Sequence, residues 1–213
     1  MSWSKKLLNA PVIGDVAKKI VSMKVNSDAM NIAEHFTKFL QPEFASTQDL
    51  TEEVYKIRHN VYCDELAFLD KHDDGREHDE FDPQSLFALI KHKPSDVYTS
   101  CVRIVKSTKP AELLPLEKLC MDSITNKELH PSNFERSEIA EISRLAVKSE
   151  FRRRKADQYK GSAQGVISEI NYSETELRCF PFIAIGLYMA GATLAIDTGV
   201  NHVYVMMEPR LAR

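Results

Sequence analysis

The most regular pattern in the chain is a set of apolar residues that recur at helical spacing between Leu50 and Tyr62. Asp49 and Glu52 stand where a capping pair would begin such a helix. Arg58 lies four residues after Val54, on the apolar face of the predicted helix. A buried guanidinium group is costly unless it is paired, so this helix predicts an acidic partner elsewhere in the chain.

Four apolar, β-rich segments predict the strands of a sheet. They are Leu86–Ile90, Val97–Val105, Ile139–Val147 and Val203–Met207. A Lys-Pro-Ser-Asp sequence separates the first two, so we expect them to form a hairpin. Charged residues interrupt two of these strands: Arg103 in the second, and Glu141 and Arg144 in the third. Strand alternation would place Glu141 and Arg144 on opposite faces unless a bulge intervenes.

Two further segments predict helices. A short helical patch is expected around Leu113–Met121, within an otherwise irregular region. The segment Cys179–Ile196 is uncharged and comes close to the length that a membrane-spanning helix needs. A helix that is buried on all sides within a domain has the same composition, and we expect this arrangement. A membrane span is the alternative.

Residues 1–45 are predicted to be an N-terminal appendage to a main domain over residues 46–213. Apolar residues between Val16 and Met23 form one helical stripe, and a second short pattern runs from Ala29 to Leu40. These amphipathic helices either pack on the main domain as a cap or make a peripheral contact with a membrane surface or a partner.

An acidic loop separates the helix that contains Arg58 from the first strand. Its acidic residues are Asp70, Asp73, Asp74, Glu77, Asp79, Glu80 and Asp82. The loop does not match a calcium-binding EF-hand, because His72 and Phe81 occupy ligand positions. We expect Asp79 or Asp82 to turn inward and pair with one of the embedded arginines. A fully solvated loop is the alternative.

Composition excludes several classes of function. The chain has 213 residues with 43% hydrophobic and 28% charged residues, which is close to the average for a soluble globular protein. Its formal net charge of −3 argues against a nucleic-acid-binding protein. None of the 7 glycines lies in a dinucleotide-binding or P-loop pattern. We therefore expect no nucleotide fold of either kind and no nucleic-acid partner.

The cysteines and histidines indicate no metal site. Cys63, Cys101, Cys120 and Cys179 form no C-x-x-C pair, and the 7 histidines show no metal-ligand spacing. A disulfide framework or a structural zinc site is therefore not expected. This cysteine usage favours a reducing, cytoplasmic location.

The motifs that carry these charges come in a definite order. They are Arg58-His59-Asn60-Val61-Tyr62, Glu65-Leu66-Ala67-Phe68, Glu77-x-Asp79-x-x-Asp82, Cys101-Val102-Arg103 and Glu141-Ile142-Ser143-Arg144. Over about residues 48–213 the ordered set resembles acyl-homoserine-lactone (autoinducer) synthases and, more closely, N-acyl amino acid synthases. It also resembles the acyltransferases of the bacterial PEP-CTERM/exosortase system, to which Tyr62–Glu65, Phe180–Tyr188 and Met207–Pro209 are similar.

This resemblance implies a mixed α/β (α+β) fold of the GNAT-like acyltransferase type. Such a fold has a twisted mixed sheet, splayed at its centre, with helices on both faces. The family domain continues past Pro209 with a helix and further strands, so the C-terminal part of the fold is expected to be missing from this chain. The implied activity is transfer of a fatty acyl group from a thioester to the amino group of an amino acid or related amine. Acyl carrier protein or coenzyme A would carry the acyl group as a co-substrate, with no bound cofactor.

The resemblance also assigns roles to residues. The catalytic pair would be Glu141, as general base, and Arg144. The substrate-binding residues would be Arg58, Tyr62, Phe68, Asp79, Asp82 and Arg103. The glycines that bind coenzyme A pyrophosphate in GNAT enzymes are absent after the third strand, which favours acyl carrier protein as the partner. From its position after a strand, the basic run Arg152, Arg153, Arg154 and Lys155 is a candidate docking site for that partner, and a solvated basic run is the alternative.

Two alternatives remain open from the sequence. One is a non-catalytic GNAT-like binding module in which the buried charges only lock the fold. The other is an acetyltransferase that uses acetyl-CoA on a small amine. A long apolar tunnel for the acyl chain would favour the fatty acyl enzyme over both.

Overall fold

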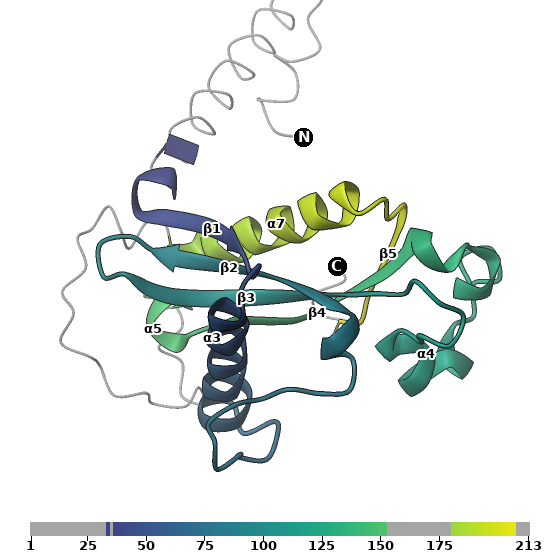
Figure 1. The fold of residues 1–213 in the computed structure, drawn as a ribbon, viewed down its shortest axis with the longest axis horizontal. Helices are drawn as coiled ribbons and strands as arrows, with labels where there is room; N and C mark the ends of the chain where they lie inside the picture. The colour runs from purple at the N-terminus through teal and green to yellow at the C-terminus, as the bar shows by residue number, and fades with distance from the viewer. Residues whose placement is uncertain (1–32, 35, 153–179, 208–213) are drawn as a thin grey trace, which may run out of the picture.

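The structure, a computed structural model, describes residues 33–34, 36–152 and 180–207. Its centre is a five-stranded mixed sheet in the order β1-β2-β3-β4-β5 (Figure 1). The strands are β1 (Leu40–Phe44), β2 (Ser85–His92), β3 (Val97–Lys106), β4 (Ile139–Val147) and β5 (His202–Val205). The pairs β1–β2, β2–β3 and β3–β4 are antiparallel, and β5 runs parallel to β4. The predicted hairpin between the second and third strands of this sheet is confirmed.

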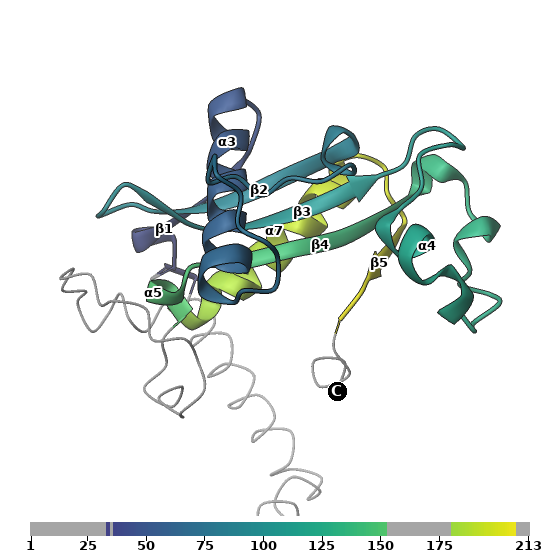
Figure 2. The ribbon, with the colours of Figure 1, turned by 90° about the horizontal axis from the view of Figure 1, so that it is seen from below.

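Helices cover both faces of the sheet, as Figures 1 and 2 show. The helices are α3 (Gln48–Arg58), which continues as a π-helical turn (His59–Glu65), α4 (Pro115–Cys120), α5 (Ser149–Arg152) and α7 (Ile183–Asp197). Helix α3 lies across one face of the sheet and α7 across the other. The mixed α/β architecture predicted from the sequence is therefore confirmed.

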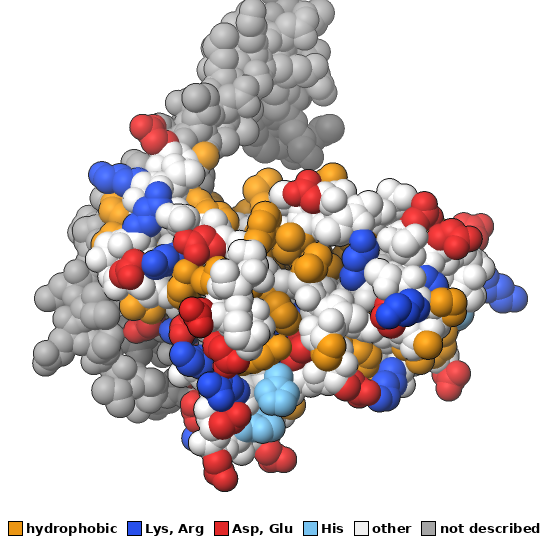
Figure 3. Space-filling model, in the orientation of Figure 1, with side chains coloured by type: hydrophobic (Ala, Val, Ile, Leu, Met, Phe, Trp, Pro, Cys, Tyr) orange, Lys and Arg blue, Asp and Glu red, His pale blue; other side chains and the backbone are white. Residues whose placement is uncertain are grey.

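The larger apolar core lies between α7 and the sheet. Ile183 and Leu187 of α7 are fully buried, and they belong to the same cluster as Ile90, Ile104 and Ile142. No helix within the described residues is long and apolar enough to cross a membrane. The expected helix of the domain core is confirmed, but the expectation that it is buried on all sides is wrong. Its outer side exposes apolar residues, and Figure 3 shows apolar side chains gathered over this part of the molecule.

Two smaller apolar clusters lie on the opposite face. In one, Val54 and Ile57 of α3 pack on Leu89 and Cys101. In the other, which includes Leu114 and Leu116 from α4 and its N-cap, the side chains pack at the other end of β3 and β4. The charged residues of β3 and β4 lie on this face of the sheet, and they form the site described below.

The N-terminal boundary of the sheet differs from the prediction. Leu40–Phe44, within the predicted appendage, forms β1 and pairs with β2 from Leu40↔His92 to Phe44↔Ala88. Only Leu40 is buried in this edge strand, so its sequence shows no clear alternation. Of the second predicted helix, Ala29–Leu40, residues 33–34 and 36–39 are helical, whereas Leu40 begins β1. Residues 1–32 lie outside the described residues, so the first amphipathic helix stays a prediction.

The start of α3 also differs. Thr47, rather than Asp49, is the N-cap residue, and its hydroxyl accepts a hydrogen bond from Leu50 N–H at 3.3 Å. Asp49 lies in the first turn, where a negative charge is favourable to the helix dipole.

Candidate active site

Arg58, which the sequence places on the apolar face of a helix, is the last residue of α3 and is fully buried. Its Nη1 donates to Asp82 Oδ1 at 2.7 Å, and its Nε donates to Glu77. Burial acts to lower the pKa of the guanidinium group, but the two carboxylates outweigh burial and raise this pKa above its ordinary value. The prediction that Arg58 has an acidic partner is confirmed.

Arg103, which lies in β3, also donates hydrogen bonds to the acidic loop. Its Nη1 donates to Asp79 at 2.5 Å and to Asp82 at 2.9 Å, and its Nε donates to Ser143 of β4 at 3.1 Å. Asp82 therefore bridges α3 and β3. Burial acts to raise the pKa of Asp79, but the hydrogen bond and charge of Arg103 hold this pKa below its usual value. The expected pairing of Asp79 or Asp82 with an embedded arginine is confirmed for both carboxylates.

Arg144 reaches this network because β4 has a bulge. The pairing of β3 with β4 shifts register between Cys101 and Arg103. Arg144 has a φ of 51°, a left-handed conformation that is uncommon outside glycine. Its guanidinium donates to Asp79 at 3.0 Å and to Glu77 at 3.3 Å. The bulge therefore breaks the strict alternation and joins Arg144 to the carboxylates that bind Arg103.

Glu141 of β4 is fully buried beside this network. Its Oε2 accepts a hydrogen bond from the backbone N–H of Leu116 at 2.7 Å, whereas its Oε1 has no hydrogen-bond partner within the described residues. Burial raises the pKa of Glu141 to about 7, although the Leu116 N–H and the charges of Arg103 and Arg144 act to lower it. A carboxyl group with such a pKa and an unpaired oxygen can take up a proton near neutral pH.

The two aromatic residues assigned to substrate binding lie in different surroundings. Tyr62 belongs to the π-helical turn, and its hydroxyl donates to Leu145 O at 2.9 Å, next to the bulge. Burial raises the pKa of Tyr62 to about 12, so its hydroxyl stays protonated at neutral pH. Phe68 follows the turn, and its side chain is 70% exposed. The structure therefore brings Tyr62, but not Phe68, to the bulge.

Of the basic run predicted to dock a carrier protein, only Arg152 lies within the described residues. It forms an ion pair with Glu65, which also accepts the backbone N–H of Ser149 at 3.0 Å. Arg152 thus links α5 to the end of the π-helical turn. Arg153, Arg154 and Lys155 lie outside the described residues.

Helix α4 supplies the one contact to Glu141 that the sequence did not predict. Leu116 lies in the first turn of α4, and its N–H is the group that binds Glu141. Pro115 at the start of this helix and Glu117 two positions later are a sequence signal for a helix N-terminus. That signal locates the helix along the chain, but it does not reveal which strand the helix faces.

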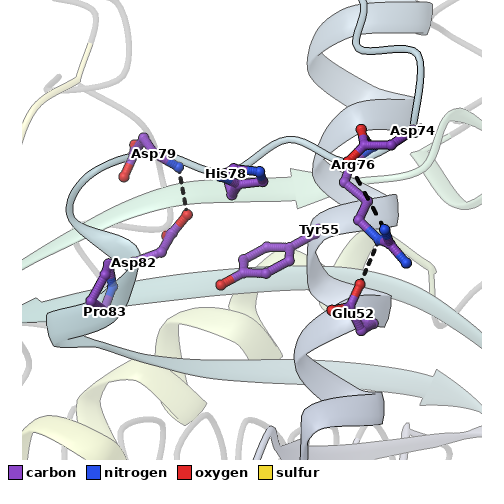
Figure 4. A pocket seen from close by; sticks show the side chains of 8 residues that line it. All are labelled: Glu52, Tyr55, Asp74, Arg76, His78, Asp79, Asp82 and Pro83. Atoms are coloured by element: carbon purple, nitrogen blue, oxygen red, sulfur yellow. Dashed lines mark hydrogen bonds and ion pairs between the residues drawn. The ribbon is translucent and has the colours of Figure 1, made fainter.

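A pocket of about 350 Å³ opens between α3 and the acidic loop (Figure 4). It is lined by Glu52, Tyr55, Asp74, Arg76, His78, Asp79, Asp82 and Pro83. Figure 4 shows Tyr55 between the helix and the loop, with Arg76 turned toward Glu52. Its carboxylates are paired with arginines: Glu52 and Asp74 with Arg76, and Asp79 and Asp82 with Arg103.

Metal and thiol chemistry have little basis in the part of the chain that the structure describes. There, no group of three or more His, Cys, Asp or Glu side chains could hold a metal ion. Cys63, Cys101 and Cys120 are free thiols. Burial raises the pKa of the Cys63 and Cys101 thiols, which makes both poor nucleophiles near neutral pH.

Residues 57–161 match the acetyltransferase (GNAT) domain family. The chain is similar to the solved structure of TofI in a ternary complex with an inhibitor and MTA, with 14% identity, a TM-score of 0.51, and coverage of 78% of this chain and 71% of that one. It is also similar to the AHL synthase LasI, with 17% identity, a TM-score of 0.48, and coverage of 81% and 73%. FeeM, an N-acyl amino acid synthase from uncultured soil microbes, has 15% identity, a TM-score of 0.49, and the same coverage of 81% and 73%. No curated protein matches the chain.

The matched segment runs from the end of α3 through β4, so it contains the whole ion-pair network and Glu141. The similarity to TofI shows a shared fold, which confirms the predicted GNAT-like architecture. The domain match supports an acyltransferase enzyme.

Proposed function

We propose that the protein is an N-acyltransferase that moves a fatty acyl group from a thioester to the amino group of an amino acid. The observation that carries this proposal is Glu141. This carboxyl group is buried within the matched domain, has a pKa raised to about 7, and keeps one oxygen without a hydrogen-bond partner within the described residues. Such a group is suited to act as a general base at neutral pH.

Amide formation requires this kind of base. An amino group must be neutral to attack a thioester carbonyl, and an α-amino group has an ordinary pKa of about 7.7–8.0. In the proposed reaction, Glu141 takes one proton from the attacking amine, directly or through a water molecule. The nitrogen forms a bond to the carbonyl carbon, the carbon–sulfur bond breaks with its electron pair going to sulfur, and the proton held by Glu141 passes to this sulfur, so that the donor leaves as a thiol.

The burial of the arginines supports Arg144 as the residue that binds the acceptor's carboxylate. Arg58 and Arg103 are 0% and 1% exposed and already bind the acidic loop, so they have no free face for a substrate. The side chains of Arg144 and Asp79 are 29% and 22% exposed and lie against each other. An amino acid could approach this pair, with its carboxylate on Arg144 through a bidentate contact.

The sheet offers a place for the reacting carbonyl. Among the described residues, the pairing of β4 with β5 extends from Ile139↔His202 to Ile142↔Val205. We propose that a backbone N–H of β4 beyond Ile142 stabilises the oxyanion, as a donor of this kind does in many acyl-transfer enzymes. The acyl chain would then lie along the apolar residues between the sheet and α7.

The proposed donor is acyl carrier protein carrying the acyl group, and acyl-CoA is the alternative. The pyrophosphate-binding glycines of GNAT enzymes are absent after β4, whereas the basic run Arg152–Lys155 is suited to an acidic partner. The proposal includes a cytoplasmic location, which the free thiols support. It also includes the link to the PEP-CTERM/exosortase system, for which the support is the motif resemblance of Tyr62–Glu65 and Phe180–Tyr188.

The test measures N-acyl amino acids by mass spectrometry after incubating the full chain with acyl carrier protein or CoA thioesters of different chain lengths and a mixture of amino acids. Glu141→Gln should lower kcat by roughly 10²- to 10⁴-fold, because glutamine cannot accept the proton. Glu135→Gln, at an exposed position, is the matched control and should keep the wild-type rate. Wild-type turnover by Glu141→Gln would show that the base lies elsewhere. Transfer of acetyl groups alone would favour a small-amine acetyltransferase.

A further inference from the structure

The first turn of α4 is held by an ion pair away from the arginine network. The carboxylate of Glu117 accepts the backbone N–H of Leu114 at 2.8 Å. Arg136, from a turn just before β4, donates to the same carboxylate through Nη1 at 2.7 Å and through Nη2 at 2.8 Å. A two-nitrogen contact of this kind fixes the orientation of both side chains as well as their distance.

Arg136 also fixes the segment that leads into α4. Its Nε donates to Ser107 Oγ at 2.8 Å, and its Nη2 donates to Glu112 O at 2.5 Å. The side chain of Glu117 is buried. Burial acts to raise the pKa of Glu117, but Arg136 and the Leu114 N–H outweigh burial and hold this pKa below its ordinary value. The pair is therefore ionised at neutral pH, and it immobilises the backbone on both sides of Leu116.

Leu116 is the residue whose N–H binds Glu141. Since that bond occupies Oε2, it leaves Oε1 as the oxygen available for a proton. The charges that act on Glu141 come from three elements: Arg103 on β3 and Arg144 on β4 are positive, and Glu117 on α4 is negative. On β5, the neutral Tyr204 lies opposite Glu141 in the ladder. The Leu116 N–H acts to lower the pKa of Glu141, so a carboxyl group released from Leu116 would have a higher pKa and would lose its fixed orientation.

We propose that Arg136, acting through Glu117 and the first turn of α4, is a positioning residue that holds Glu141 in the orientation and at the basicity needed for proton transfer. This inference rests on the proposed function, in which Glu141 is the base. It assigns a role in the reaction to a residue that touches neither substrate nor the reacting atoms.

The test uses Arg136→Gln and Arg136→Lys in the full chain. Arg136→Gln should lower kcat by about 10-fold or more while the KM for the acyl donor changes little, because only the base is misplaced. The acid limb of the pH profile of kcat should move to higher pH, because the Leu116 N–H would no longer stabilise the Glu141 carboxylate. Arg136→Lys should recover part of the loss, since lysine keeps the charge but not the two-nitrogen contact. Lys91→Gln, which removes the ion pair with Asp96 in the β2–β3 hairpin, is the control and should leave both quantities unchanged.

A second measurement does not depend on turnover. The difference in thermal stability between Glu141→Gln and the wild-type chain, followed across pH, reports the pKa of Glu141. In the Arg136→Gln background this transition should move to higher pH, since a weaker bond from Leu116 raises the pKa of Glu141. If Arg136→Gln does not fold, Arg136→Lys carries both measurements with smaller shifts in the same directions.

The outcomes separate the two proposals. A folded Arg136→Gln variant with unchanged kcat, pH profile and stability transition would overturn the positioning role and leave Glu141 as the base. Wild-type activity of Glu141→Gln would instead overturn the proposed function. When both proposals hold, Arg136→Gln causes no further loss of kcat once Glu141 has been replaced by Gln, since the two changes act on one step.

Discussion

Glu141 shows how one buried carboxyl group links stability to chemistry. Its pKa is raised by burial to about 7, so the folded chain keeps a proton that the unfolded chain releases at lower pH. Below the ordinary glutamate pKa both states are protonated and the group imposes no penalty. Between that value and about pH 7 the folded chain binds more protons, so stability falls as the pH rises. Above this window the penalty is complete.

The first prediction concerns this penalty. Glu141→Gln removes the ionisation, so its free energy of unfolding relative to wild type should rise between about pH 4.5 and pH 7.5 and then level off. The rise should be about 3 kcal/mol, the equivalent of a pKa change of this size. Urea unfolding at several pH values measures it, and Glu135→Gln should follow the wild-type curve. Parallel curves for Glu141→Gln and wild type would mean that the pKa of Glu141 is not raised in the folded chain.

At the residue scale, the sequence predicted which charged residues form ion pairs better than it predicted where each side chain lies. A buried arginine requires a counter-charge, and that rule alone was enough to pair Arg58 and Arg103 with the acidic loop. The position of Arg144 depends on a bulge and a left-handed φ, and no residue type at that position signals either. The exposure of Phe68 was also not predicted, because the resemblance assigns a role to this residue but does not give its conformation.

The acidic loop works as an element that joins a helix to the sheet. Asp82 accepts hydrogen bonds from Arg58 at the end of α3, from Arg103 in β3, and from the loop's own backbone at Asp79 N–H, at 2.7 Å. Because these donors come from three separate segments, this one carboxylate fixes how the helix lies on the strand. The loop is also the wall of the pocket in Figure 4.

The second prediction follows from this arrangement. Asp82→Ala leaves two buried guanidinium groups without a shared partner, and it should lower the free energy of unfolding by about 3–5 kcal/mol. Asp82→Asn keeps the shape of the side chain but not its charge, and it should cost less than Asp82→Ala. Chemical denaturation measures both. Asp73→Ala, in an exposed part of the same loop, is the control and should cost little. A cost for Asp82→Ala no larger than that of the control would show that the bridge does not hold α3 to β3.

At the element scale, the apolar pattern of the sequence predicted buried strands better than the exposed edge strand. Strands β2, β3 and β4 are mostly buried. The predicted bounds match β4, fall one residue short of β3, and cover only Leu86–Ile90 of β2. Edge strand β1 buries only Leu40, so it was assigned to the appendage. The patch around Leu113–Met121 was recognised as helical, yet the contact of Glu117 with Arg136 joins residues 19 positions apart across an irregular segment. No periodic signal links such residues.

In the molecule as a whole, the two faces of the sheet differ in polarity. The face under α7 is apolar, and the face under α3 carries the charges in the gap between two apolar clusters. Water reaches this charged layer at Arg144 and Asp79, while Arg58 and Arg103 beneath them are sealed. The buried arginines therefore hold the scaffold in place, and the exposed edges of Arg144 and Asp79 are where the proposed acceptor would approach.

The last prediction concerns the donor, which the whole chain must recognise. The net charge of −3 disfavours an acidic partner in general, so recognition of acyl carrier protein requires a local basic surface. Arg152 already binds Glu65 and belongs to the fold, so the variant to make is Arg153→Ser, Arg154→Ser and Lys155→Ser together. The KM for acyl carrier protein thioesters should rise about 10-fold at low salt and lose most of its dependence on ionic strength. The KM for acyl-CoA should change little, which makes acyl-CoA the internal control. An unchanged KM and salt dependence for acyl carrier protein would exclude these three residues from the docking surface, whereas equal losses with both donors would indicate a general effect on the enzyme.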